Sequence, residues 1–149
     1  MRVAIACDHS AFACKQALVP YIERLGHEVL DMGCCGTVSV DYPEYALKVA
    51  RAVAAGEAER GVLICATGIG MSIAANKVDG IRCALCADPV SARLTRAHND
   101  SNVLALGALV CGQALTEGIV GVWLQTGFSD EERHQRRIDA IAEIERTYL

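Results

Sequence analysis

No apolar run in this sequence reaches the length of about 18 residues that a membrane-spanning helix needs. The opening segment, MRVAIACDHS, has too short an apolar run for a secretory signal and reaches Asp8 and His9 at once. Linkers, low-complexity stretches and internal repeats are also missing from the sequence. We therefore expect one domain over residues 1–149, large enough for a single sizeable core, and no membrane partner.

An excess of positive charge is also lacking. The chain has 14 Lys and Arg residues against 18 Asp and Glu, a net charge of −4 with His neutral. This balance argues against broad nucleic-acid binding through surface charge, so we expect no nucleic-acid partner. Hydrophobic residues make up 52% and charged residues 21% of the chain, which is typical of a globular protein and not of a disordered one.

Cysteine, in contrast, is abundant. The eight cysteines are Cys7, Cys14, Cys34, Cys35, Cys65, Cys83, Cys86 and Cys111. A secreted disulfide scaffold is disfavoured because the chain is long and apolar and has no secretory signal. The segment CALC has the spacing of a metal or redox pair, but Cys83 and Cys86 would point to opposite faces of a predicted strand. We expect reduced thiols, a cytoplasmic protein and no bound metal or cofactor.

Short apolar segments alternate with amphipathic ones along the whole chain. We predict strands over residues 2–7, 28–32, 61–65, 81–86 and 102–106. We predict helices near residues 11–25, 43–55, 70–77, 89–98, 113–126 and 130–148. Pro43 and Pro89 suit a first helical turn, with Asp41 and Asp88 as nearby caps. The alternation predicts an α/β fold: a five-stranded parallel sheet, doubly wound as a Rossmann-like three-layer sandwich, with an extra C-terminal helix.

Two groups of polar residues fall at the carboxyl ends of predicted strands, where ligands gather in such sheets. Asp8 and His9 follow the first strand, and the segment CATGIGMS, which starts at Cys65, follows the third. Its glycines allow a turn that exposes backbone N–H groups, and the next helix adds its unpaired N–H groups. The result is an anion cradle in which the Cys65 thiolate is favoured and could act as a base.

Simpler interpretations of these residues stay open at this point. Cys65 could be core filler, and Asp8 could only cap the next helix. The glycine loop resembles a dinucleotide-binding turn but lacks the third glycine of that motif. A phospho-receiver domain also has an Asp after its first strand, but it would need another Asp in place of Cys65 and a Lys after the last strand.

Two further polar groups contain His98 and Asn99, and Arg133 and Arg137. The two arginines are four residues apart, so they share a helix face and could bind one phosphate. The alternative is a solvated face on which they pair with acidic neighbours such as Asp130 and Glu132, and His98 could simply interact with a helix end.

Topology separates these groups from the thiol. The helix that ends at His98 starts at the carboxyl edge of the sheet and runs back to the amino edge, about 17 Å away for a five-residue strand. The helix that carries Arg133 also follows a descending helix. If His98 acts together with Cys65, it does so across subunits, which predicts an obligate homodimer with shared sites.

The ordered motifs CDHSA, DYPEYA, CATGIGMSIAANK, GIRCAL, SARLTRAHNDSNVLALG and RHQRRI resemble those of the type B ribose-5-phosphate isomerases. This family also includes the galactose-6-phosphate isomerase subunits. The resemblance implies interconversion of aldose and ketose phosphates through a cis-enediolate, without metal or organic cofactor. It also implies a dimer or tetramer with sites at the dimer interface.

The resemblance further implies roles for individual residues. Cys65 would be the base that moves a proton between C1 and C2 of the sugar. Ring opening and hydroxyl proton transfer would fall to Thr67, Asp8 and His98. The backbone cradle for the enediolate would comprise Gly68, Ile69, Gly70, Met71 and Ser72. The phosphate would be bound by His9, Arg133 and Arg137, with Asn99 and Tyr42 as further substrate contacts.

The sequence departs from the family pattern in three places. Ala66 replaces a common glycine, Leu109 replaces an arginine that helps bind phosphate, and Glu131 and Glu132 replace a Gly-Gly pair. All three changes concern the substrate end of the site. We expect ribose 5-phosphate and ribulose 5-phosphate as the substrate pair. A tetrose or hexose phosphate or a free sugar is the alternative, and a non-catalytic anion-binding module is the rival from another class.

Overall fold

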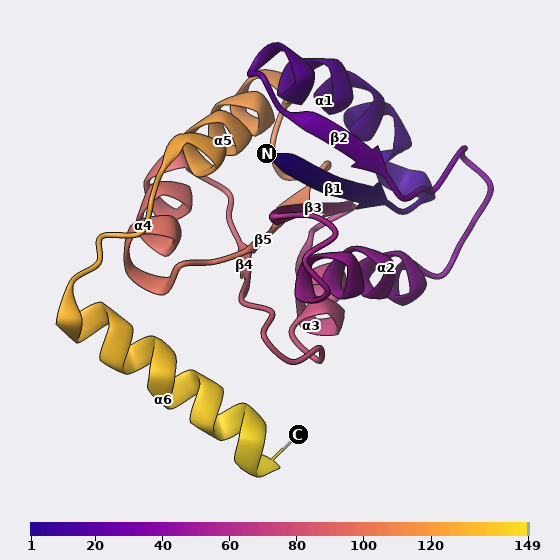
Figure 1. The fold of residues 1–149 in the computed structure, drawn as a ribbon. Coiled ribbons are helices and arrows are strands. Elements are labelled where there is room, and N and C mark those ends of the chain that lie inside the picture. Colours follow the sequence, from indigo (N-terminus) through magenta and orange to yellow (C-terminus); the bar gives the residue numbers. More distant parts are fainter. Residues whose placement is uncertain (149) are drawn as a thin grey trace.

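Strands and helices follow one another in the computed structural model, which describes residues 1–148, in the order expected from the sequence (Figure 1). The strands are Arg2–Cys7 (β1), Glu28–Asp31 (β2), Arg60–Cys65 (β3), Cys83–Leu85 (β4) and Val103–Gly107 (β5). The helices are Phe12–Arg24 (α1), Tyr42–Ala54 (α2), Ile69–Ala75 (α3), Pro89–Asn99 (α4), Gln113–Gln125 (α5) and Glu132–Tyr148 (α6), with a short 3-10 turn at His9–Ala11 (η1).

All the strand pairings are parallel, and the strand order is β2-β1-β3-β5-β4. The predicted doubly wound α/β fold is therefore confirmed. β1, β3 and β5 are central and nearly every residue in them is buried, because helices cover both faces. Side chains of α1, α4 and α5 pack on one face, and side chains of α2 and α3 pack on the other.

The last helix stands apart from the three layers (Figure 1). α6 packs against α4, and farther along the Gly80 N–H donates to Glu145 Oε2 at 3.1 Å. Between α6, α4 and β4 lies an open groove of 390 Å³, whose lining includes Ile81, Ile141 and Ile144. The apolar side chains of Ile141 and Ile144 on this face of α6 are exposed.

Two local predictions need correction. β4 is shorter than the predicted strand over 81–86, because the Arg82 N–H donates to the Asn102 side chain at 2.8 Å instead of joining the ladder. Asp41 occupies the N-cap position of α2, but its side chain makes no capping hydrogen bond. Asp88 does cap α4, since its Oδ1 accepts from the Ser91 N–H at 2.8 Å.

Within residues 1–148, no helix combines the length and the apolar character that crossing a bilayer requires.

Candidate active site

The ends of β1 and β3 bring the first group of predicted site residues together. The strands are neighbours, with Cys7 opposite Ile64, so the residues that follow them emerge side by side. The Asp8 N–H donates to the Ile64 carbonyl oxygen at 3.1 Å, directly before Cys65 in the chain. Asp8 and Cys65 therefore lie at the same carboxyl edge of the sheet, as the sequence predicted.

Asp8 is buried and also caps the η1 turn. Its Oδ1 accepts from the N–H groups of Ser10 and Ala11 at 3.0 and 3.2 Å and from the Ser10 hydroxyl at 2.6 Å. The capping role considered for this residue is thus real. All the hydrogen bonds of the carboxylate within the described chain end on Oδ1, which leaves Oδ2 for a ligand.

Cys65 lies under the glycine loop, with 5% of its surface exposed. The Gly68 N–H donates to its Sγ at 3.1 Å. Gly68 has a φ of +78°, and a Cβ there would lie 2.6 Å from Leu85 Cδ1 and 2.8 Å from the carbonyl carbon of Leu106. Only glycine fits this position, and it directs a backbone donor at the sulfur.

The remaining N–H groups of the loop divide into two sets. The Ser72 N–H is used inside the loop, where it donates to the Gly68 carbonyl oxygen at 3.0 Å. The N–H groups of Gly70 and Met71 find no acceptor within residues 1–148. The loop therefore offers two unpaired donors at the start of α3.

Tyr42 and Thr67 border this loop. A Cβ on Gly70 would lie 2.5 Å from Tyr42 Cζ and 2.7 Å from its hydroxyl oxygen, so the tyrosine ring covers the loop. Thr67 is exposed and its Oγ1 accepts from the Ile69 N–H at 3.4 Å. Thr67 and Ile69 also line a pocket of 250 Å³ toward β4 and β5, which includes Leu85 and Val110.

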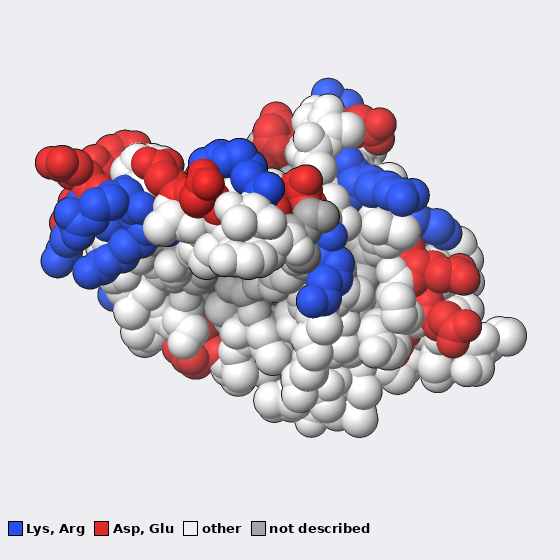
Figure 2. All heavy atoms as spheres, turned by 90° about the horizontal axis from the view of Figure 1, so that it is seen from below, with Lys and Arg blue, Asp and Glu red and all other residues white. Residues whose placement is uncertain are grey.

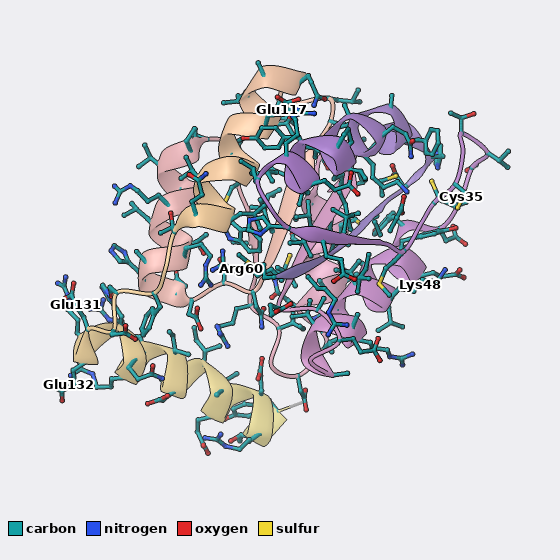
Figure 3. All side chains as sticks on the ribbon, turned by 45° about the horizontal axis from the view of Figure 1, so that its top comes forward. Cys35, Lys48, Arg60, Glu117, Glu131 and Glu132 are labelled. Atoms are coloured by element: carbon teal, nitrogen blue, oxygen red, sulfur yellow. The ribbon has the colours of Figure 1, made fainter. Side chains whose placement is uncertain are left out.

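His9 is held by the loop between β2 and α2. The Val40 N–H donates to His9 Nδ1 at 3.2 Å. This bond assigns Nδ1 as the acceptor and leaves the other ring nitrogen, Nε2, as the donor of the neutral tautomer. The same loop carries Cys35, which points away from the sheet in Figure 3.

The second group of predicted residues lies at the opposite edge. The Gly61 N–H, at the start of β3, donates to the Asn102 carbonyl oxygen, whereas Cys65 at its end pairs with Gly107. His98 and Asn99 precede Asn102, and the Arg82 Nε–H ties the Asn99 carbonyl oxygen to the start of β4 at 2.9 Å. The predicted separation of His98 from Cys65 within one chain is confirmed.

α6 adds its first turn to this second group. The imidazole of His134 lies against that of His98, with ring centroids 4.2 Å apart. Burial lowers the pKa of His134, and the neighbouring His98 lowers it further. His134 was not among the predicted site residues. The sequence signal that could have identified His134 is its spacing: it lies four residues before Ile138, so the two share one face of the predicted helix. In the structure this face of α6 is buried, whereas the arginines of the helix are exposed.

Arg133 and Arg137 are both exposed on α6. Arg133 Nε donates to Glu131 Oε2 at 2.7 Å, so the ion pair anticipated with Glu132 or Asp130 forms with a different neighbour. Arg133 holds the pKa of Glu131 below its usual value. Figure 2 shows basic and acidic side chains next to one another around a broad uncharged area.

Three of the other cysteines lie in surroundings that suppress ionisation. Burial raises the pKa of Cys7 to about 12, of Cys83 to about 12 and of Cys86 to about 11. Cys83 and Cys86 pack into the cores on opposite faces of the sheet, as predicted for the CALC segment. No cluster of three His, Cys, Asp or Glu side chains in residues 1–148 is arranged to hold a metal ion.

Comparisons with known proteins agree with this geometry. The model of the Ribose/Galactose Isomerase family matches residues 3–141. Ribose-5-phosphate isomerase B of Escherichia coli is 48% identical over 144 residues, covering 97% of this chain and 96% of its own. The solved structure of Clostridium thermocellum ribose-5-phosphate isomerase B is 47% identical, with a TM-score of 0.98 and complete coverage of both chains.

A second solved structure carries a ligand. Ribose-5-phosphate isomerase B of Mycoplasma genitalium, with bound ribulose-5-phosphate, is 34% identical and has a TM-score of 0.92. The match covers 98% of this chain and 97% of that one. Family match, sequence identity and fold agree over nearly the whole length, so the chain belongs to the Ribose/Galactose Isomerase family.

Proposed function

We propose that this protein interconverts ribose 5-phosphate and ribulose 5-phosphate through a cis-enediolate, with Cys65 as the base. The observation that carries the proposal is the hydrogen bond from the Gly68 N–H to Cys65 Sγ, beside the unpaired N–H groups of Gly70 and Met71. A base and an oxyanion cradle are the two components that proton transfer next to a carbonyl requires. The relatives from Escherichia coli and Clostridium thermocellum carry the name of this activity.

The proton transfer balances without another reactant. The Cys65 thiolate takes the C2 proton of the open-chain aldose, which leaves a thiol and an enediolate. The thiol then returns a proton to C1, and a proton moves from the C2 hydroxyl to O1, giving the ketose. Backbone N–H groups stabilise the charge that develops on O1 and O2, which is where a preorganised donor lowers the barrier most.

The other residues divide between ring opening and binding. Asp8 Oδ2 and the Thr67 hydroxyl lie at the thiol's edge of the sheet and would handle hydroxyl protons, while His98 would open the furanose ring. His9, Arg133 and Arg137 would bind the phosphate through charge-assisted hydrogen bonds. Asn99 and Tyr42 would complete the substrate contacts.

The same proposal requires a homodimer. Cys65 and Asp8 lie at one edge of the sheet and His98, Asn99 and Arg133 at the other, so one chain holds two half-sites. A two-fold axis would bring the carboxyl edge of each copy to the amino edge of its partner. Exposed apolar side chains beside the pocket at Thr67 and on α6 provide the surface for such contact: Ile69, Leu85, Val110, Ile141 and Ile144.

We place the protein in the cytoplasm, where phosphorylated sugars are found. All eight cysteines are free thiols in the structure, the state that a reducing compartment maintains.

The decisive experiment follows hydrogen exchange between solvent D₂O and C2 of ribose 5-phosphate by NMR. The wild-type protein exchanges and isomerises the substrate. Cys65→Ala loses exchange by several orders of magnitude and still binds ribose 5-phosphate, because it lacks only the base. Cys35→Ala, which removes an exposed thiol, serves as the control and keeps full activity. Normal exchange by Cys65→Ala would exclude Cys65 as the base.

A different sugar is the second candidate, favoured by Leu109. This side chain is 78% exposed at the position where the family resemblance implies a phosphate-binding arginine, and Arg133 forms an ion pair with Glu131. Turnover of a panel of tetrose, pentose and hexose phosphates and the free sugars identifies the substrate. Arg137→Ala raises KM for a phosphorylated sugar and leaves a free sugar unaffected. Binding without any exchange across the panel would favour the non-catalytic module.

A further inference from the structure

His134 is a buried histidine that the proposed mechanism does not use. Only 3% of its surface is exposed, although Arg133, Arg136 and Arg137 around it on α6 are exposed. Its ring faces the half-buried ring of His98, with the centroids 4.2 Å apart and the planes tilted by 35°. Flat rings at this distance and angle restrict each other's rotation about the side-chain torsions.

A chain of contacts ties His134 to the backbone that carries His98. The Ser129 N–H donates to the Ala97 carbonyl oxygen at 3.0 Å, one residue before His98. The Ser129 hydroxyl then lies 2.7 Å from His134 Nδ1. Asp130, with a φ of +56°, makes the turn that brings Ser129 and α6 into this arrangement. The contacts thus form a closed loop from Ala97 through Ser129 and His134 back to His98.

The surroundings favour a neutral His134. Burial lowers its pKa, and His98, Arg133 and Arg137 lower it further, while Glu131 acts in the opposite direction. The Ser129 oxygen accepts from the Glu131 N–H at 3.4 Å, which leaves the Ser129 hydroxyl proton free to donate to Nδ1. A neutral His134 ring packs against His98 without bringing a positive charge next to it.

We propose that His134, fixed by Ser129, is a positioning residue that holds the His98 imidazole in the orientation needed to open the sugar ring. The inference rests on the proposed function, in which His98 acts on the furanose form. It concerns ring opening alone, so proton transfer at Cys65 and phosphate binding do not depend on it. The orientation of the His98 ring matters because a displacement of a catalytic group by about 1 Å can lower the rate about a hundredfold.

Kinetics of single and double variants test the proposal. His134→Ala lowers kcat for ribose 5-phosphate by about ten- to a hundredfold and changes KM little. The loss disappears in a His98→Ala background, because a residue that acts through His98 has nothing left to position. Arg136→Ala, an exposed change on the same helix, leaves kcat unchanged. An additional loss from His134→Ala in the His98→Ala background would overturn the proposal.

An open-chain substrate separates positioning from a general structural effect. Ribulose 5-phosphate cannot form a furanose because its C5 oxygen carries the phosphate. His134→Ala therefore still exchanges the C1 hydrogen of ribulose 5-phosphate with D₂O, while its net conversion to ribose 5-phosphate falls. Equal losses of exchange and conversion would contradict the inference. If the wild-type protein showed neither reaction, the proposed function itself would fail.

Two milder variants keep the test valid if His134→Ala does not fold. His134→Phe retains a ring against His98 and keeps most of the conversion rate. Ser129→Ala leaves His134 in place but removes the bond to Nδ1, so it lowers conversion relative to exchange by a smaller factor. If Ser129→Ala has the same ratio of conversion to exchange as the wild-type protein, the contact between Ser129 and His134 does not position His98.

Discussion

At the scale of single residues, the chemistry of the site depends on which groups surround each thiol. Loss of solvation by burial is the largest effect on Cys7, Cys83 and Cys86, and it raises the pKa of each. Cys65 is equally enclosed but accepts a hydrogen bond from the Gly68 N–H. In the proposed mechanism Cys65 is the base, and Gly68 is the residue that directs this donor at its sulfur.

Substitution of Gly68 tests this dependence. Gly68→Ala destabilises the protein beyond the roughly 1 kcal/mol expected for a positive φ alone, because its Cβ would collide with the Leu106 backbone. Activity falls as well, since the loop must shift its donor away from Cys65. Gly56→Ala is the matched control: its φ is +74°, but no atom lies within 4 Å of the added Cβ. Urea denaturation and kcat/KM are measured for both, and equal destabilisation would contradict the argument.

At the scale of elements, a side chain distant in sequence can bind the backbone carbonyl groups that are left unpaired at the end of a helix. Arg60, at the start of β3, caps the end of α5. Its Nη1 donates to the carbonyl oxygens of Trp123 and Leu124 at 2.8 and 3.0 Å, and its Nη2 donates to Thr126 at 3.3 Å. Burial lowers its pKa to about 10, so it remains charged at neutral pH. The contact with Thr126 therefore fixes the start of the connection between α5 and α6 against β3.

Removal of this cap has a measurable cost. Arg60→Met lowers the free energy of unfolding by about 2 kcal/mol, because hydrogen bonds to a charged group are lost and the carbonyl groups are left partly unpaired. Arg51→Met, on the exposed face of α2, changes it by less than about 0.5 kcal/mol. The measurement is chemical denaturation at neutral pH. Similar values for the two variants would show that the Arg60 contacts add nothing to stability.

At the scale of the whole molecule, the two half-sites lie at opposite edges of one sheet. The carboxyl edge holds the thiol, the donors and Asp8, and the amino edge holds His98 and the arginines of α6. Because neither edge alone contains both the proposed base and the arginines proposed to bind phosphate, the proposed activity requires a dimer.

Mixing two strongly impaired variants tests this assembly. Cys65→Ala and His98→Ala are unfolded together and refolded at equal concentration. Random pairing makes half of the dimers mixed, and each mixed dimer has one intact site, so about one quarter of the wild-type activity returns. Each variant refolded alone keeps only its low residual activity. No recovery from the mixture would place both residues in the same chain's site and exclude the shared arrangement.

The sequence by itself determined the alternation of strands and helices, and with it the edge at which each polar group lies. Periodicity is local, and right-handed parallel crossovers leave little freedom in where a strand ends, so Asp8 and Cys65 could be assigned to one edge and His98 to the other. Only the tertiary structure decided that Tyr42 covers Gly70 and that His134 faces His98. Those contacts join elements far apart in the chain, and packing between elements, which no local pattern encodes, selects them.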